Sequence, residues 1–255
     1  MFVELLSHTE NPEKVIGTAA KVCYAPGTVN DVWNTEFNYG DFIQKLRTMG
    51  HMSPFEHANF TWGIDGISRA CSHQLVRHRV ASFSQQSQRY VEYDMDNPDC
   101  FNLDDFYVVP ELLVDSNSEA SDVYLAALDS VSDVYAALVD SLKNEGFDAR
   151  QAAENARYIL PNAMKTNLVM TMNARELMHF FNVRCCRRAQ LEIRELAWSM
   201  FDICTQRFPE IFENCGPNCL QRGCTEGRMS CGNTFADTEE GFEWYSIYGH
   251  GTKLP

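Results

Sequence analysis

A short basic segment in an acidic chain most strongly constrains how these 255 residues can fold. Residues 77–90 (RHRVASFSQQSQRY) carry three arginines and one histidine but no Asp or Glu, although the chain has a formal net charge of −14. Because like charges repel, a fold tolerates such a segment most easily where an anion binds it. The planar guanidinium of arginine suits phosphate and nucleobase edges. The segment therefore predicts an anion site, and a solvated loop with scattered ion pairs is the alternative.

The charge balance and the apolar pattern narrow the class of protein. Asp and Glu total 35 against 21 Lys and Arg, which disfavours a general nucleic-acid binder, since such a protein needs a broad basic surface. No apolar run approaches the roughly 20 residues of a membrane span, and no basic segment precedes the first apolar residues as in a signal peptide. We therefore expect a cytoplasmic protein without nucleic-acid or membrane partners, whose ten cysteines are reduced.

The apolar periodicity indicates both strands and helices. Strands are expected at 1–6, 58–64 and 165–172, and helices at 14–22, 40–48, 67–76, 118–144, 148–159, 173–182 and 189–208. Asp148 and Asn173 are typical N-cap residues. The order predicts an α/β (α+β) fold with a mixed sheet flanked by long helices. A boundary near residue 210 would separate a domain at 1–210 from a Gly/Cys-rich tail at 211–255.

The sequence lacks the glycine-rich motifs that bind nucleotides through backbone amides. It contains neither G-x-G-x-x-G after a strand nor G-x-x-x-x-G-K-[ST]. A bound nucleotide would therefore have to be held by side chains, which again favours the arginines of residues 77–90.

The basic segment also resembles a family signature. Its pattern R-H-R-x-x-S-x-x-x-x-S-x-R is similar to that of the flavin-dependent thymidylate synthases, the X-type class. The similarity extends to HMSPFEH at 51–57, ARYILP at 156–161, NAREL at 173–177 and AQLEI at 189–193, and covers roughly residues 1–210. It implies a thymidylate synthase-complementing fold and a homotetramer whose active sites combine residues of several subunits.

The resemblance also implies a reaction and a set of contacts. The enzyme would be a methyltransferase that converts dUMP into dTMP, with 5,10-methylenetetrahydrofolate giving the carbon and FAD, reduced by NADPH, giving the hydride. FAD contacts are implied for Ser53, Arg77, His78, Arg79, Gln85, Asn173, Arg175 and His179. Contacts to dUMP are implied for Gln74, Arg77, Gln85, Gln86, Ser87, Gln88, Arg89, Arg157 and Arg184. His51 is implied near the flavin or the folate.

Arg184 is the expected catalytic residue. Carbon C5 of uracil is a poor nucleophile until negative charge on N3 and O4 feeds the ring, and a fixed guanidinium stabilises that charge. Ser87 has no acid–His arrangement around it in the sequence, so we expect it to hydrogen-bond dUMP instead of attacking it. Two positions depart from the family pattern. Gln85 replaces a glutamate found in some members, and His179 replaces a common asparagine, either as a hydrogen-bonding residue or as an ordinary buried histidine.

The cysteines leave one question open. No metal is assigned to the active site. The tail residues Cys215, Cys219, Cys224 and Cys231 follow the spacing C-x₃-C-x₄-C-x₆-C, which fits either a structural zinc site or a flexible tail with reduced thiols. Cys71 and the pair Cys185–Cys186 are expected to act as small buried hydrophobes.

Two other functions fit parts of the sequence. A zinc-stabilised sensor could use the arginines to hold a nucleotide or an RNA end, and a flavoprotein oxidoreductase could reduce a different acceptor. Formation of dTMP distinguishes the expected enzyme from both.

Overall fold

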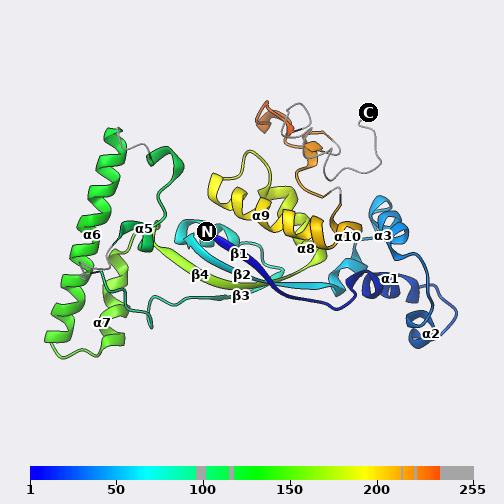
Figure 1. Cartoon of the computed structure of the whole chain (residues 1–255), viewed down its shortest axis with the longest axis horizontal. Coiled ribbons are helices and arrows are strands. Elements are labelled where there is room, and N and C mark those ends of the chain that lie inside the picture. The colour runs from blue at the N-terminus through cyan, green and yellow to red at the C-terminus, as the bar shows by residue number, and fades with distance from the viewer. Residues whose placement is uncertain (96–101, 115–117, 214, 221–222, 236–255) are drawn as a thin grey trace. The chain divides into compact units, whose positions relative to one another are not determined.

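A computed structural model describes residues 1–95, 102–114, 118–213, 215–220 and 223–235 of the chain (Figure 1). The chain forms two compact units. Unit 1 contains residues 1–2, 64–76 and 84–169, and unit 2 contains residues 3–63, 77–83 and 170–255. Residues 236–255, the last part of the expected tail, lie outside the described residues. No helix in the described part of the chain is long and apolar enough to cross a membrane.

The four strands of the described residues form one small sheet in the order β1-β2-β4-β3. Their bounds are β1 Phe2–His8, β2 Asn59–Ser68, β3 Ala81–Gln85 and β4 Lys165–Asn173. In unit 2 the hydroxyl of Thr61 lies 2.9 Å from that of Thr171, whereas in unit 1 the Gly66 amide donates to Asn167 Oδ1 at 3.0 Å. The numbers rise along β2 as they fall along β4, so these strands are antiparallel. The sheet is antiparallel, and the expected mixed sheet is wrong.

The connections between strands explain the antiparallel pairing. The Thr9 amide, just after β1, donates to the Asn59 carbonyl at the start of β2. The Gln86 amide, just after β3, donates to the Asn167 carbonyl near the start of β4. Each of these two long connections thus leaves and returns at the same end of its strand pair, whereas the connection from β2 to β3 skips the position of β4 in the sheet.

Unit 1 is built around its longest helix, α6. Its helices are α4 Arg69–Leu75, α5 Leu103–Phe106, α6 Glu119–Asn144 and α7 Ala149–Ala156. Figure 1 shows α6 and α7 side by side, and Leu128, Tyr135 and Val139 of α6 share one apolar cluster with Ala152 and Ala156 of α7. The expected N-cap at Asp148 is confirmed, because its carboxylate accepts the Gln151 amide at 2.8 Å.

In unit 2 the last helices pack together through a core of aromatic side chains. Its helices are α1 Pro12–Val22, α2 Val29–Trp33, α3 Tyr39–Thr48, α8 Ala174–Arg184, α9 Leu191–Arg207 and α10 Pro209–Phe212. Phe181 of α8 packs 5.2 Å from Phe201 of α9 and 6.0 Å from Phe212 of α10, measured between ring centroids. This packing fixes α8. The expected N-cap at Asn173 is also confirmed, since its side chain accepts the Glu176 amide at 2.9 Å.

Candidate functional site

His78 joins two charged side chains within unit 2. The Nε of Arg184 donates to His78 Nε2 at 3.0 Å, and His78 Nδ1 lies 3.3 Å from Glu176 Oε1. Arginine can only donate, so Nε2 must carry a lone pair and the imidazole proton must sit on Nδ1. His78 therefore donates to Glu176 as a neutral ring. We call this arrangement the Glu176–His78–Arg184 chain.

Helix α8 provides both ends of this chain. Glu176 lies in its first turn and Arg184 in its last, so each charge opposes the partial charge at its end of the helix. Phe180 lies between them at four-residue spacing, which places all three on one face. The Phe180 ring packs edge-on at 5.0 Å against the imidazole of His78. The helix thus holds His78 by packing as well as by hydrogen bonds.

Burial shifts the pKa values of the side chains in the Glu176–His78–Arg184 chain. His78 is only 7% exposed. Its burial, together with the nearby positive charge of Arg184 and the neighbouring His179, lowers the pKa of the imidazole from 6.5 to about 4. Burial raises the pKa of the Glu176 carboxyl, while His179 acts in the opposite direction. The imidazole is therefore neutral at physiological pH, as the hydrogen bonds require.

The same residues resemble a metal site in composition. Among the described residues, His78, Glu176 and His179 are the one group whose potential ligand atoms all lie within 4.8 Å. A cation there would need the Nδ1 lone pair of His78, which requires the other tautomer and breaks the hydrogen bond from Arg184. It would also sit close to a guanidinium. We therefore assign hydrogen bonding, and no metal, to this group.

A cavity of about 430 Å³ opens beside the Glu176–His78–Arg184 chain in unit 2. It is lined by Glu56, Val80, Asn173, Arg175, Glu176 and His179. Three of these residues, Asn173, Arg175 and His179, were expected at FAD. Arg175 already contacts Glu56 at 2.5 Å, and Asn173 caps α8. His179 is exposed, so it is not the buried histidine considered as the alternative.

Apart from the buried His78 and the half-buried Gln85, the remaining residues expected at FAD lie on exposed positions. Arg77 and Arg79 are exposed, and within the described part of the chain neither has an ion-pair partner. Ser53 begins a short 3₁₀ helix, and His51 precedes it; both side chains are exposed. All of these residues belong to unit 2. Gln85 alone belongs to unit 1, where its amide donates to the Thr166 hydroxyl at 3.2 Å.

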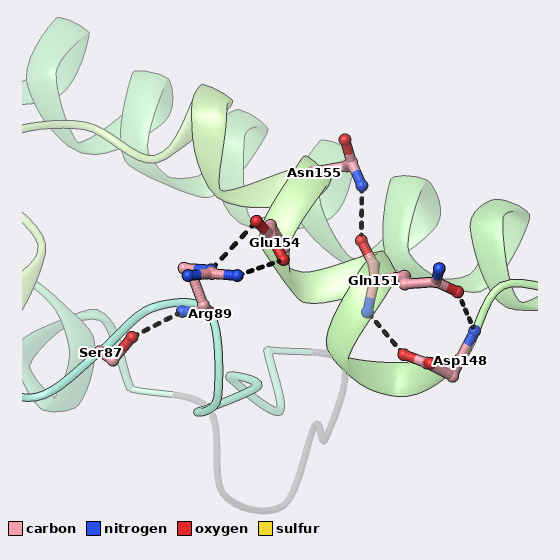
Figure 2. Close-up of polar contacts among 6 residues, drawn as sticks. All are labelled: Ser87, Arg89, Asp148, Gln151, Glu154 and Asn155. Carbon is pink, nitrogen blue, oxygen red and sulfur yellow. Dashed lines mark hydrogen bonds and ion pairs between the residues drawn. The ribbon is translucent and has the colours of Figure 1, made fainter.

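Arg89 is paired with a distant carboxylate in unit 1. Figure 2 shows its guanidinium against Glu154 of α7, with Nη2 donating to Oε2 at 3.1 Å and Nε 3.0 Å from Oε1. Ser87 Oγ accepts the backbone amide of Arg89 at 3.3 Å. Arg89 therefore forms an ion pair, which is the alternative considered for residues 77–90. The carboxylate comes from a segment 65 positions later.

The other residues expected at dUMP differ in exposure. Gln88 is buried, and it hydrogen-bonds with Tyr93, whose pKa is raised mainly by burial. Gln74, Gln86 and Arg157 are half-buried. Except for Arg77 and Arg184, the residues expected at dUMP lie in unit 1, whereas those expected at FAD lie mainly in unit 2.

The sequence did not predict three acidic residues that pair with basic residues of the site. Glu176, Glu154 and Glu56 pair with His78, Arg89 and Arg175 respectively. Glu176 stands three residues after the N-cap Asn173, a position that commonly holds an acidic residue, so its place in the first turn was foreseeable. Nothing in the sequence links Glu154 or Glu56 to its arginine.

Acid should destabilise the protein through His78. Between pH 6.5 and pH 4 the unfolded chain binds a proton that the folded chain excludes, so the free energy of unfolding falls as pH falls through that window. The loss approaches about 3 kcal/mol, less the opposing contribution of Glu176, whose raised pKa lets the folded chain take up a proton earlier. Urea unfolding at several pH values should show a smaller loss in His78→Gln than in the unsubstituted protein. Equal losses would contradict the buried neutral imidazole.

A family model matches most of the chain. The model described as thymidylate synthase complementing protein matches residues 4–210. This range contains the Glu176–His78–Arg184 chain and the Arg89–Glu154 pair.

Curated proteins and solved structures give the same likeness. A flavin-dependent thymidylate synthase of Geobacter sulfurreducens is 44% identical over 250 residues, covering 97% of this chain and 100% of that protein. One of Clostridium tetani is 42% identical over 241 residues, covering 90% and 92%. The fold is similar to that of the Helicobacter pylori flavin-dependent thymidylate synthase ThyX in complex with FAD and dUMP. That comparison has a TM-score of 0.64 and 24% identity, and covers 85% of this chain and 100% of the solved one.

Proposed function

Because the chain belongs to the family of flavin-dependent thymidylate synthases, we propose that it converts dUMP into dTMP with 5,10-methylenetetrahydrofolate as the carbon donor, NADPH as the reductant and FAD as the cofactor. The match at residues 4–210 is the observation that carries this proposal. We place the enzyme domain at residues 1–210 and treat 211–255 as its tail.

The side chains of unit 2 suit an anionic flavin cofactor. Arg77 and Arg79 are exposed without ion-pair partners among the described residues, so they are available to a diphosphate. Arg175 and His179 line a cavity of about 430 Å³, a volume within the range of small-molecule sites. We assign FAD contacts to these four residues and to Ser53, with His51 nearby. Bound FAD would supply the redox chemistry of the reaction.

We assign the catalytic role to Arg184. Its Nε hydrogen bond to His78 fixes the orientation of the guanidinium. A fixed positive charge stabilises the negative charge that develops on N3 and O4 of the pyrimidine without reorganising, which makes C5 nucleophilic. A neutral His78 is essential here, because an imidazolium could not accept from Arg184. Glu176 is a positioning residue that sets the tautomer of His78.

We assign dUMP to the polar residues of unit 1, chiefly Ser87, Arg89 and Arg157. Their guanidinium and hydroxyl donors suit a phosphate. From the family alone, we also propose a homotetramer whose active sites combine residues of several subunits. Sedimentation at working concentration tests this assembly, and a monomer that makes dTMP would contradict it.

The reaction itself is the direct test. Purified protein is incubated with FAD, NADPH, 5,10-methylenetetrahydrofolate and dUMP, and dTMP is separated and quantified. We expect dTMP only when all four are present. Oxidation of NADPH without dTMP would indicate a flavoprotein oxidoreductase with another acceptor, and dUMP binding without either reaction would indicate a nucleotide sensor.

Replacing Ser87 by alanine should weaken dUMP binding while turnover continues. The Ser87 hydroxyl is placed to donate to a ligand while its oxygen accepts the Arg89 amide, and the substitution removes both bonds. We expect KM for dUMP to rise several-fold, which corresponds to the loss of about one hydrogen bond, with kcat changed little. Steady-state kinetics measure both constants. Complete loss of kcat at normal dUMP affinity would instead identify Ser87 as a nucleophile.

A further inference from the structure

Four cysteines line a single cavity in unit 2. The cavity, of about 290 Å³, receives Cys186 from the connection between α8 and α9 and Cys219, Cys224 and Cys231 from the C-terminal segment. Cys186 therefore does not act as the buried hydrophobe expected from the sequence. Its neighbour Cys185 is fully buried.

The cysteine set differs from the one that the sequence spacing offers. Cys215 is buried away from this cavity, with its Sγ 3.3 Å from Nη2 of Arg47. Cys219, Cys224 and Cys231 keep their place in the set, and Cys186, which is 33 positions before Cys219, replaces Cys215. Four thiols from two separate segments thus face one space.

Contacts other than thiols hold the two segments together. The Asn218 amide donates to Asn182 Oδ1 at 3.2 Å, and Arg188 pairs with Glu226 at 2.6 Å. Glycines allow the turns beside two of the cysteines. Gly223 precedes Cys224 with φ 79°, and Gly232 follows Cys231 with φ 72°, backbone conformations that favour glycine. The arrangement of the cysteines is therefore built into the fold.

We propose that Cys186, Cys219, Cys224 and Cys231 bind one zinc ion. Four thiolates are the ordinary ligand set of a closed structural zinc site. They leave an excess of negative charge around the ion, and Arg184 and Arg187 line the same cavity and offset it.

Zinc binding requires deprotonation and a small closure of the site. Zinc binds thiolates, so the four thiols would release their protons as the ion enters. Among the described residues, no three of these sulfur atoms all lie within 4.8 Å of one another. Closing them around the ion moves the C-terminal segment toward the residues that follow Arg184. Zinc would then anchor the C-terminal end of α8, where Arg184 is the last residue.

The metal content of the purified full-length protein tests the proposal independently of its catalytic activity. After dialysis into metal-free buffer, elemental analysis should find about one zinc ion per chain, and thiol modification should release it to a colorimetric chelator. Cys186→Ser and Cys224→Ser should each lose the zinc. Two matched controls, Cys215→Ser and Cys23→Ser, should retain it, since neither cysteine lines the cavity.

Several results would overturn the proposal. These are unsubstituted protein with four reactive thiols and no zinc, a disulfide among the four cysteines, or stoichiometric iron in place of zinc. Loss of zinc from Cys215→Ser together with its retention by Cys186→Ser would move the site to the four tail cysteines. If Cys186→Ser fails to fold, Cys224→Ser, an exposed position, still decides the outcome.

Discussion

Replacing Arg184 by alanine should nearly abolish dTMP formation while FAD stays bound. The substitution removes the positive charge assigned to N3 and O4 of the pyrimidine, and loss of one such preorganised donor typically lowers kcat by about 10²- to 10³-fold. Arg184→Lys should recover little of the rate. An ammonium lacks the planar guanidinium fork, which can donate to the pyrimidine and to His78 at the same time. Single-turnover conversion of dUMP and the flavin absorbance measure the two quantities separately.

Arg207 provides the matched control for this experiment. It is the last residue of α9 as Arg184 is the last residue of α8, so both alanine variants lose a favourable charge at a helix C-terminus. Arg207 is exposed and its guanidinium packs against Phe208 at 5.7 Å. Arg207→Ala should keep the normal rate. A normal rate in Arg184→Ala would remove its assigned role, and loss of flavin from that variant would reassign Arg184 to cofactor binding.

The helices were predictable where their ends carry local signals. Asp148 and Asn173 cap helices at the expected residues, and α6 extends over the expected range because one broad apolar face runs along it. Helix α2 was missed although Thr28 and Asp31 form a capping box, because its five residues are too few for a periodic apolar pattern. Strand β3 was missed because ASFSQ has no buried residue to reveal an alternation.

The pairing of the strands could not be predicted from the sequence. Helical segments between strands suggest crossovers and a mixed sheet, but α1–α3 and α6–α7 each return to the end from which they left. Whether a connection crosses or returns depends on tertiary packing, and no local pattern records it.

The candidate site was predictable in its residues but not in their partners. Motif resemblance selected Arg184, His78 and Arg89 individually. The bond between Arg184 and His78 spans 106 positions, and the pair of Arg89 with Glu154 spans 65. Such long separations leave no spacing signal, so the partners of these residues could not be predicted from the sequence. The structure changes what that segment can do, because its positive charge remains unpaired only at Arg77 and Arg79 within the described residues.

Removing the Arg89 side chain should raise KM for dUMP by about 10- to 100-fold with a much smaller change in kcat. This range is that of a lost charge-assisted hydrogen bond to phosphate. The competing explanation is that Arg89 serves only its pair with Glu154, which anchors residues 87–89 to α7 (Figure 2). Steady-state kinetics of Arg89→Ala, Glu154→Ala and the double variant distinguish the two, because they form a complete double-mutant cycle.

The cycle has opposite outcomes for the two roles. If Arg89 binds dUMP, its removal raises KM in the Glu154→Ala background as well, and Glu154→Ala alone has a small effect, since the released guanidinium still reaches the phosphate. If the pair only holds the loop, each single variant raises KM equally and the double variant adds nothing. The second pattern would leave dUMP binding to Arg157 and Ser87. The first would show that Arg89 binds dUMP directly and does not need Glu154 to do so.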